Sequence, residues 1–309
     1  MSCSPSSRVS SQPREGSAPT PSESSYRLAV RLLEGKVAVV TGGGRGLGRA
    51  HALTLAALGA AVVVNDVGSG VHGGGCDTSV ADAVVDDIGS GGGRAAADHS
   101  DVSTMAGAAR VVDRARAAFG GVDIVVNNAG VSRQTPIQDL DEETLDLHLG
   151  VHLKGTVGTT RAAFPVMRAR GGGSVVNTVS GAGLFPEHPG TAAYACAKAA
   201  VYAFTKVAAV EGAPHGIRVN AVSPLALTRM SQAFFARAGA GAEERLGPER
   251  ASVVVAYLAS HLAAAVTGRV LRVEGGHVCE VFMDRTPGAE SEQWAPEGLA
   301  DRMGEVLRA

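Results

Sequence analysis

From Lys36 onward, short runs of apolar residues alternate with longer segments in which apolar and polar residues follow a helical period. The short runs are apolar throughout, without the alternation expected of a strand that has one face in water. Strands of this kind, separated by helices, form a parallel sheet that helices cover on both faces. We therefore predict seven strands, at residues 36–41, 61–66, 94–98, 122–127, 174–179, 217–222 and 270–273.

The segments between these strands show the helical period of about 3.6 residues. They predict helices at residues 47–58, 78–88, 103–119, 141–168, 192–212 and 251–260. The resulting domain spans residues 33–278, and residues 279–309 are predicted to be a C-terminal extension that packs on the same domain. The first 32 residues are rich in Ser and Pro and lack the apolar core of a secretory signal, which predicts a disordered tail. A transit peptide is the alternative for that tail.

Composition narrows the function classes only slightly. The chain has 309 residues, of which 45% are hydrophobic and 19% charged, and a net charge of −2 gives no general case for nucleic acid or anionic membrane as partner. No apolar run approaches the roughly 20 residues of a membrane span. The four cysteines show neither metal-ligand nor disulfide spacing, so we predict no metal and a reducing, cytoplasmic location.

A glycine-rich turn joins the first strand to the first helix. It reads Thr41-Gly-Gly-Gly-Arg-Gly-Leu-Gly48, and Gly42, Gly46 and Gly48 permit a tight turn with close backbone approach to a pyrophosphate. The positive end of the following helix favours the same anionic group. A generic glycine-rich turn is the alternative, but the strand–turn–helix context favours a nucleotide site.

Two charged residues near this turn bear on the choice of nucleotide. Asp66 ends the second strand, where a carboxylate can accept hydrogen bonds from ribose hydroxyls and repel a 2′-phosphate, which favours NAD. A loop-capping aspartate is the alternative. Arg45 lies within the turn and favours NADP instead, because a cation there can pair with a 2′-phosphate; stacking over adenine or facing solvent is its alternative role.

A tyrosine and a lysine stand four residues apart on the helix after the fifth strand. Tyr194 and Lys198 therefore share one helix face. A nearby ammonium favours the phenolate and lowers a tyrosine pKa from about 10 towards working pH. Ser180 follows the fifth strand and could donate a hydrogen bond to a substrate oxygen. The three residues together indicate an acid–base site.

In combination with Asn127-Asn-Ala-Gly130 after the fourth strand, these motifs resemble the short-chain dehydrogenase/reductase superfamily over residues 33–277. The resemblance implies a single Rossmann-like, doubly wound α/β domain and an NAD(P)-dependent oxidoreductase. It also implies that Tyr194 is the general acid/base, that Lys198 lowers its pKa and holds the nicotinamide ribose, and that Ser180 polarises the substrate oxygen. Asn127 would support the cofactor and its strand. The predicted cofactor-binding residues are Thr41, Gly42, Arg45, Gly46, Leu47, Gly48, Asp66, Asp101, Val102, Asn128, Ala129, Gly130, Tyr194, Lys198, Pro224 and Thr228.

One branch of the superfamily is more similar than the rest. Residues 62–68 (VVVNDVG) and 151–155 (VHLKG) are similar to the (3R)-hydroxyacyl-CoA dehydrogenase unit of peroxisomal multifunctional enzymes. His152 stands where most of the superfamily has an asparagine that relays protons to the lysine. The resemblance therefore adds His152 to the predicted catalytic residues, and residues 277–294 also resemble the extended tail of that branch.

Two departures from the family pattern fall near the predicted site. The spacing from Ser180 to Tyr194 is one residue longer than usual, and we place the extra residue between Leu184 and Thr191. The usual Pro-Gly after the sixth strand is Pro224-Leu225, although Thr228 could still reach a carboxamide. Glu187 and His188 are interpreted as solvated loop residues, and Cys196 as a small packed helix residue.

Three functions are compatible with the sequence. The leading one is an oxidoreductase that interconverts a secondary alcohol and a ketone, on a 3-hydroxyacyl or 3-oxoacyl thioester or a polyketide-like ketone, with NAD preferred over NADP. The alternatives are a redox-neutral cyclase or epimerase that uses the same site, and a cofactor-binding regulator without turnover. Apolar residues around the helix at 192–212, among them Val207 and Val210, predict a homodimer or homotetramer.

Overall fold

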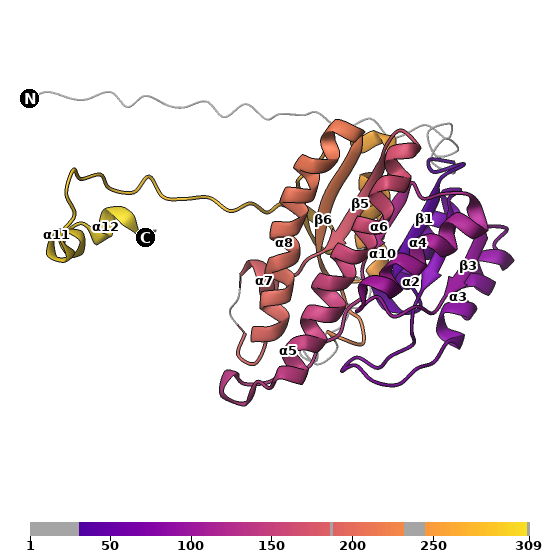
Figure 1. Cartoon of the computed structure of the whole chain (residues 1–309), viewed down its shortest axis with the longest axis horizontal. Coiled ribbons are helices and arrows are strands. Elements are labelled where there is room, and N and C mark those ends of the chain that lie inside the picture. Colours follow the sequence, from indigo (N-terminus) through magenta and orange to yellow (C-terminus); the bar gives the residue numbers. More distant parts are fainter. Residues whose placement is uncertain (1–30, 186–187, 232–244, 308–309) are drawn as a thin grey trace, which may run out of the picture.

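The structure is a computed structural model that describes residues 31–185, 188–231 and 245–307. Residues 1–30 of the predicted N-terminal tail, and Glu187 of the predicted loop insertion, lie outside the described residues. The described chain forms one central sheet with helices on both faces (Figure 1). It contains no helix that is both long and apolar enough to cross a membrane.

Seven parallel strands form the body of the sheet. Their order is β3-β2-β1-β4-β5-β6-β7. The first three strands are added towards one edge of the sheet and the later ones towards the other, so the strand order reverses between β1 and β4. At such a reversal the loops at the carboxyl ends of the strands separate and leave a crevice where ligands bind. The strands are β1 (Val37–Thr41), β2 (Ala61–Asn65), β3 (Arg94–Asp98), β4 (Ile124–Asn127), β5 (Gly173–Thr178), β6 (Ile217–Leu225) and β7 (Val270–Glu274).

An eighth strand corrects the prediction of seven. β8 (His277–Glu280) pairs with β7 in the antiparallel direction at the edge of the sheet. The two strands are joined by Gly275 and Gly276, and Gly275 adopts a positive φ of 59° that a tight hairpin turn requires. Because β8 is mostly exposed, it lacks the continuous apolar character by which the other strands are recognised.

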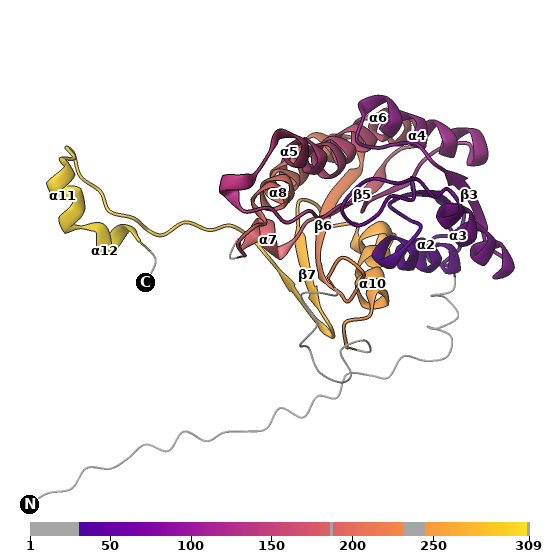
Figure 2. The same ribbon diagram turned by 90° about the horizontal axis from the view of Figure 1, so that it is seen from below.

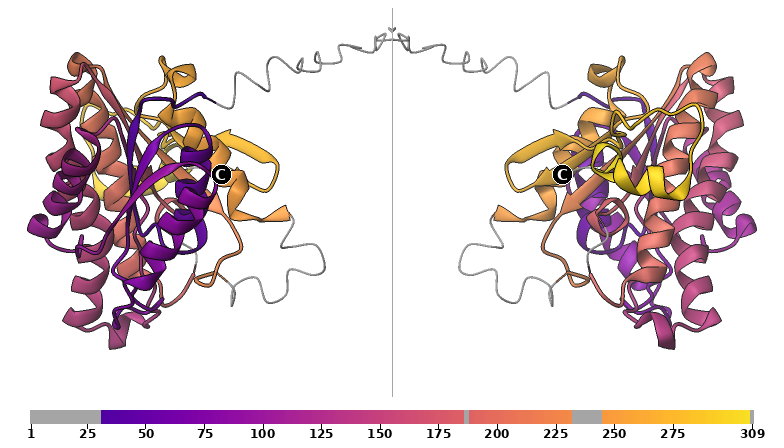
Figure 3. Two further views of the ribbon diagram at one scale, coloured as in Figure 1. Left: turned by 90° about the vertical axis from the view of Figure 1, so that its right-hand side faces the viewer. Right: turned by 90° about the vertical axis from the view of Figure 1, so that its left-hand side faces the viewer.

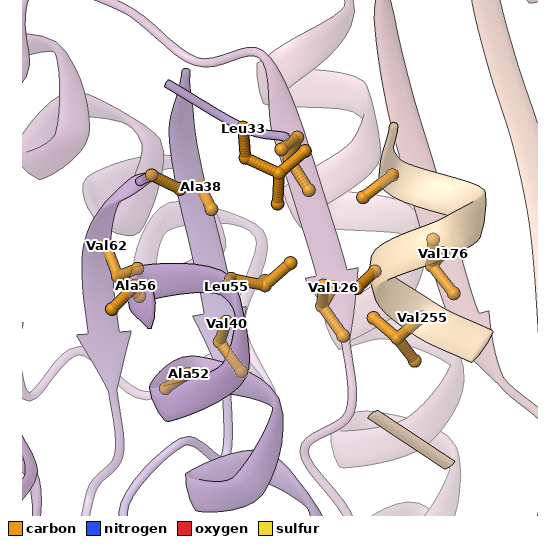
Figure 4. Packing of buried hydrophobic residues seen from close by; sticks show 14 of the residues in the cluster. Leu33, Ala38, Val40, Ala52, Leu55, Ala56, Val62, Val126, Val176 and Val255 are labelled. Carbon is orange, nitrogen blue, oxygen red and sulfur yellow. The ribbon is translucent and has the colours of Figure 1, made fainter. Parts of the chain in front are cut away.

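Helices cover both faces of the sheet (Figures 2 and 3). Side chains alternate along β1, so that Ala38 and Val40 belong to one core cluster while Val37 and Val39 belong to the other. In Figure 4 Leu55 and Val255 pack over Val40, Val126 and Val176 from three neighbouring strands. One layer consists of α2 (Gly46–Ala57), α3 (Ser79–Ser90) and α10 (Pro248–Ala259), and the other of α4 (Met105–Phe119), α6 (Gly155–Ala169) and α8 (Ala192–Gly212).

The long helix predicted at residues 141–168 is interrupted. It consists of α5 (Glu142–His148), the π-helical segment η2 (Leu149–Lys154) and α6. The Asp141 carboxylate caps α5 by accepting a hydrogen bond from the main-chain N–H of Thr144 at 2.8 Å. A π-helical turn widens the backbone and redirects side chains, and it is often found at functional sites. Here it contains His152.

Shorter helices complete the chain. They are η1 (Ile137–Asp139), α7 (Gly181–Leu184), η3 (Ala213–His215), η4 (His261–Ala263), α11 (Pro296–Asp301) and α12 (Met303–Val306). The last two belong to a C-terminal segment that runs away from the sheet (Figures 1 and 2). That residues 279–309 pack on the domain therefore stays a prediction. Exposed apolar side chains occur on this segment, at Phe282 and Met283, and on α8, at Val207 and Val210. They are compatible with the predicted homo-oligomer, which also stays a prediction.

Candidate active site

A cavity of about 650 Å³ opens at the carboxyl ends of β1, β2, β4, β5 and β6. Nearly all the predicted site residues line it, whether they come from the glycine turn, the strand ends or α8. Thr41 and Asn127 are the exceptions among the predicted residues, and both are buried just behind the cavity wall. The structure thus brings together predicted residues as far apart in the chain as Gly42 and Thr228.

The glycine turn is packed against the loop after β4. A Cβ atom on Gly48 would lie 1.9 Å from the Gly42 carbonyl oxygen, and one on Gly42 would lie 2.7 Å from the Cα of Ala129. Gly42 also has a positive φ of 61°. Side chains at either position would therefore force the two loops apart. Their close approach leaves main-chain atoms at the start of α2 facing the cavity, as a pyrophosphate site requires.

Thr41 and Asn128 hold that arrangement from behind. The Thr41 hydroxyl accepts hydrogen bonds from the main-chain N–H groups of Asn128 and Ala129, both at 3.1 Å. In return the Asn128 side-chain amide donates to the carbonyls of Thr41 and Gly42, at 3.0 and 3.1 Å. Thr41 is thus a positioning residue, whereas Asn128 both positions the turn and lines the cavity.

The Asp66 carboxylate faces the turn at the end of β2. One oxygen accepts a hydrogen bond from the main-chain N–H of Gly44 at 2.9 Å, and the other from Gly68 at 2.7 Å. A carboxylate has about four lone-pair sites, so capacity remains for a ribose hydroxyl. Asp66 therefore caps the loop, as the alternative interpretation predicted, and it lines the cavity as well.

The remaining predicted cofactor residues lie around the rim. Val102 is buried, and the exposed Asp101 accepts hydrogen bonds from the main chain and hydroxyl of Ser103, both at 2.8 Å. The Thr228 side chain lies next to Gly46, because a Cβ atom added to Gly46 would be 3.6 Å from the Thr228 methyl group. Pro224 lies within β6 and lines the cavity, although the residue after it departs from the family pattern.

The three predicted acid–base residues meet on the cavity floor. Ser180 caps α7, its hydroxyl accepting a hydrogen bond from the main-chain N–H of Ala182 at 3.3 Å. Lys198 is buried, and its ammonium donates to the Thr178 carbonyl at 2.6 Å. That ammonium lies 5.9 Å from the centre of the Tyr194 ring. A substrate oxygen between Ser180 and Tyr194 would have two hydroxyl groups within reach.

Burial determines the proton affinities of this group. It raises the pKa of Tyr194 above its usual value, and a hydrogen bond with Ser180 acts in the opposite direction. It lowers the pKa of Lys198 to about 7. That Lys198 lowers the pKa of Tyr194 stays a prediction, because in this structure burial is the larger cause and raises the pKa of Tyr194. A group that favours the ammonium form of Lys198 would strengthen the predicted effect.

Asn127 organises the strands beneath the site. Its side-chain amide donates to the Thr160 hydroxyl at 3.0 Å and to the Asn177 carbonyl oxygen at 2.9 Å, and Asn177 in turn donates to Thr205 on α8. This buried chain ties β4 and β5 to the helix that carries Tyr194. The Asn127 side-chain oxygen has no hydrogen-bond partner among the described residues.

His152 is placed beside Tyr194 by the π-helical segment. Its ring meets the tyrosine edge to face, with centres 5.1 Å apart, and its Nε2 lies 2.8 Å from the Val131 carbonyl oxygen. A Cβ on Gly130 would fall 2.7 Å from this ring, so glycine is needed there. The sequence reasoning missed His148, which stacks on His152 with ring centres 6.0 Å apart. Its position four residues earlier on the same helical face was the available signal.

We expect the free energy of unfolding of the ligand-free protein to depend on pH because of Lys198. Its pKa in the folded chain lies below that of an exposed lysine, so the unfolded chain binds more protons between about pH 7 and 10.5. The free energy of unfolding therefore rises with pH through that range. Below that range Lys198 is charged in the folded chain, and the fold bears the full cost of burying its ammonium group. We expect Lys198→Met to raise the free energy of unfolding by a few kcal/mol at pH 6, with the gain shrinking towards pH 10.

Urea denaturation at several pH values measures this effect. Lys154→Met, at an exposed position on the preceding segment, is the matched control and should change stability little. A Lys198→Met protein that is less stable than the wild type at pH 6 would show that the hydrogen bond to Thr178 outweighs the cost of burying the ammonium.

The fold and the residues gathered in its cavity are those of a dinucleotide-dependent oxidoreductase. A family model described as short chain dehydrogenase matches residues 36–238. The chain therefore belongs to the short-chain dehydrogenase family, and it is an oxidoreductase of the type that uses NAD or NADP.

Individual relatives agree with this membership. The chain is 41% identical to a hydroxyacyl-CoA dehydrogenase of Mycobacterium tuberculosis, over 86% of this chain and 87% of that protein. It is 36% identical to the peroxisomal hydratase-dehydrogenase-epimerase of Neurospora crassa over 88% of this chain, but it spans only 30% of that protein. A crystal structure of a short chain dehydrogenase from Mycobacterium avium superposes with a TM-score of 0.79 at 39% identity, covering 90% of this chain and 97% of the other. The resemblance to the (3R)-hydroxyacyl-CoA dehydrogenase branch is thereby confirmed.

Proposed function

We propose that the protein oxidises the 3-hydroxyl group of a 3-hydroxyacyl thioester to a ketone with NAD, and catalyses the reverse reduction. The observation that carries the proposal is the convergence of Ser180, Tyr194 and Lys198 in one cavity with the glycine turn and Asp66. The similarity to a hydroxyacyl-CoA dehydrogenase over most of both chains supports the substrate class.

The residues present fit a nicotinamide dinucleotide. The turn leaves no space for a Cβ at Gly42 or Gly48, which is the arrangement that lets a pyrophosphate approach the backbone. Asp66 would hold the ribose of the adenosine half, while Lys198 and Thr228 would hold the nicotinamide half. Bound NAD supplies the acceptor for the hydride that leaves the carbinol carbon.

The chain's own residues handle the proton and the oxygen. Ser180 would orient the substrate hydroxyl, and Tyr194 as phenolate would take its proton while the carbinol carbon loses a hydride. Lys198 in its ammonium form would stabilise that phenolate. His152 would fix the Tyr194 ring by its edge-to-face contact, and its Nδ1, which has no hydrogen-bond partner among the described residues, could pass a proton onward.

NAD is proposed as the preferred cofactor because Asp66 follows β2, where a carboxylate would accept hydrogen bonds from the ribose and repel a 2′-phosphate. Its two main-chain hydrogen bonds hold the charged oxygens in the turn. Repulsion between this carboxylate and a phosphate dianion favours the unphosphorylated ribose.

The experiment is a rate measurement at the absorbance band of reduced nicotinamide. A panel of (3R)- and (3S)-3-hydroxyacyl-CoA thioesters and simple secondary alcohols is offered with NAD or NADP. We expect turnover of one 3-hydroxyacyl enantiomer, with a higher kcat/KM for NAD. Thioester turnover no faster than that of simple alcohols would contradict the substrate class, and better use of NADP would contradict the role of Asp66.

A further inference from the structure

Arg45, the cation of the glycine turn, is already paired. Its guanidinium Nη2 lies 3.1 Å from an oxygen of Asp77, and its Nη1 donates to the Ser69 carbonyl at 3.4 Å. Asp77 is separated from it by 32 positions in the chain. The sequence placed these two residues in different segments, so this ion pair becomes visible only in the folded protein.

The loop after β2 brings Asp77 to the turn. The main-chain N–H of Asp77 donates to the Val67 carbonyl at 3.3 Å, which closes the loop at its base. Gly68 has a positive φ of 75°, and a Cβ there would fall 2.0 Å from the Asp77 carbonyl oxygen. The two ends of the loop are therefore held in direct contact beside Asp66, whose carboxylate accepts from the Gly68 N–H.

Asp77 is also held in its charged form. Its carboxylate accepts a hydrogen bond from the Ser79 hydroxyl at 2.5 Å. This hydrogen bond, with a smaller contribution from Arg45, lowers the pKa of Asp77 below its usual value. At neutral pH the pair is therefore a full ion pair, and the loop engages the Arg45 guanidinium through the Asp77 carboxylate and the Ser69 carbonyl.

An arginine near the acidic residue that binds the adenosine ribose is the usual partner of a 2′-phosphate in dinucleotide sites. We propose that Asp77 is a specificity-determining residue that engages Arg45 and so denies a 2′-phosphate its partner. This inference rests on the proposed function, since it presupposes a dinucleotide in the cavity. Selection of NAD then has two sources, namely repulsion by Asp66 and engagement of Arg45 by Asp77.

The expected effect is modest, because the pair is partly exposed, with 31% of the Arg45 side chain and 50% of the Asp77 side chain accessible. Exposed ion pairs contribute little, so freeing Arg45 should tighten NADP binding by roughly two- to fivefold. NAD has no phosphate for Arg45 to meet, and its affinity should change much less.

Isothermal titration of the full chain with NAD and with NADP tests this directly. The variants are Asp77→Asn, which frees Arg45, and Asp77→Glu, which keeps the charge and should retain the wild-type preference. The double variant Arg45→Ala/Asp77→Asn shows whether the arginine mediates the effect. We expect tighter NADP binding in Asp77→Asn but not in Asp77→Glu. In the double variant we expect this increase in NADP affinity to disappear.

Three outcomes would overturn the inference. An unchanged NADP-to-NAD affinity ratio in Asp77→Asn, with NAD binding retained, contradicts it while leaving the proposed function intact. A gain that persists in the double variant shows that Asp77 acts by its own charge and not through Arg45. A wild-type protein that binds neither nucleotide contradicts the proposed function, and this inference with it.

Discussion

Replacing Tyr194 with phenylalanine is expected to lower kcat by about 10²- to 10⁴-fold while cofactor affinity changes little. The substitution removes one hydroxyl group and keeps the ring, so the edge-to-face contact with His152 is preserved. The Tyr194 phenol shares a hydrogen bond with Ser180, and its ring centre lies 5.9 Å from the Lys198 ammonium, so the phenol is placed to exchange a proton with a substrate oxygen there. Steady-state rates and nucleotide titrations on the same protein measure the two effects separately.

Tyr257→Phe is the matched control for this variant. Tyr257 lies on α10, away from the cavity, and its side chain is partly exposed. Its substitution should leave both kcat and cofactor affinity at the wild-type level. Activity of Tyr194→Phe within a few-fold of the wild type would mean that another group, with His152 the nearest candidate, exchanges the proton.

Replacing Ser180 with alanine is the second large effect that we expect. Ser180 lies at the carboxyl end of β5 and lines the cavity, where its hydroxyl can meet the developing negative charge on a substrate oxygen. A hydrogen bond of this kind is worth roughly 3–4 kcal/mol in a site shielded from water. The Ser180→Ala variant should therefore lose about two orders of magnitude in kcat, with cofactor affinity almost unchanged.

Thr178→Val is the matched comparison, because Thr178 ends β5 two residues before Ser180 and also lines the cavity. Its hydroxyl is buried and has no hydrogen-bond partner in the described part of the chain. A methyl group in its place removes an unpaired polar atom, so stability should change more than rate and should increase. The reverse pattern, with Thr178→Val inactive and Ser180→Ala active, would show that Thr178 is the polarising hydroxyl.

Residues near one another in sequence were the most predictable part of the site. The glycine turn, the Tyr194–Lys198 pair and the strand before Ser180 each occupy one continuous segment, in which spacing and local structure determine geometry. The parallel sheet then brings the segments together, because all its strands point their carboxyl ends to one edge. The central strands were predictable from their composition, since burial on both faces makes strands such as β1, β2 and β4 almost wholly apolar.

The features that sequence reasoning missed depend on contacts between segments or on local exceptions. β8 is a short, exposed edge strand whose clearest signal was the Gly275-Gly276 turn. The π-helical turn that aims His152 has no simple sequence signature. The pairing of Arg45 with Asp77 depends on the closure of a loop, and the altered proton affinities of Tyr194 and Lys198 depend on how completely the folded chain excludes water around them.

Transfer of isotope tests the central claim most directly. A 3-oxoacyl-CoA substrate is incubated with NADH that carries deuterium at C4 on both faces, and the product is analysed by mass spectrometry. The account predicts a 3-hydroxyacyl product with one deuterium on the carbinol carbon from the wild type, and very little of it from Tyr194→Phe. A product at the same oxidation level as the substrate, formed without deuterium and without consumption of NADH, would contradict hydride transfer and favour a redox-neutral reaction in the same cavity.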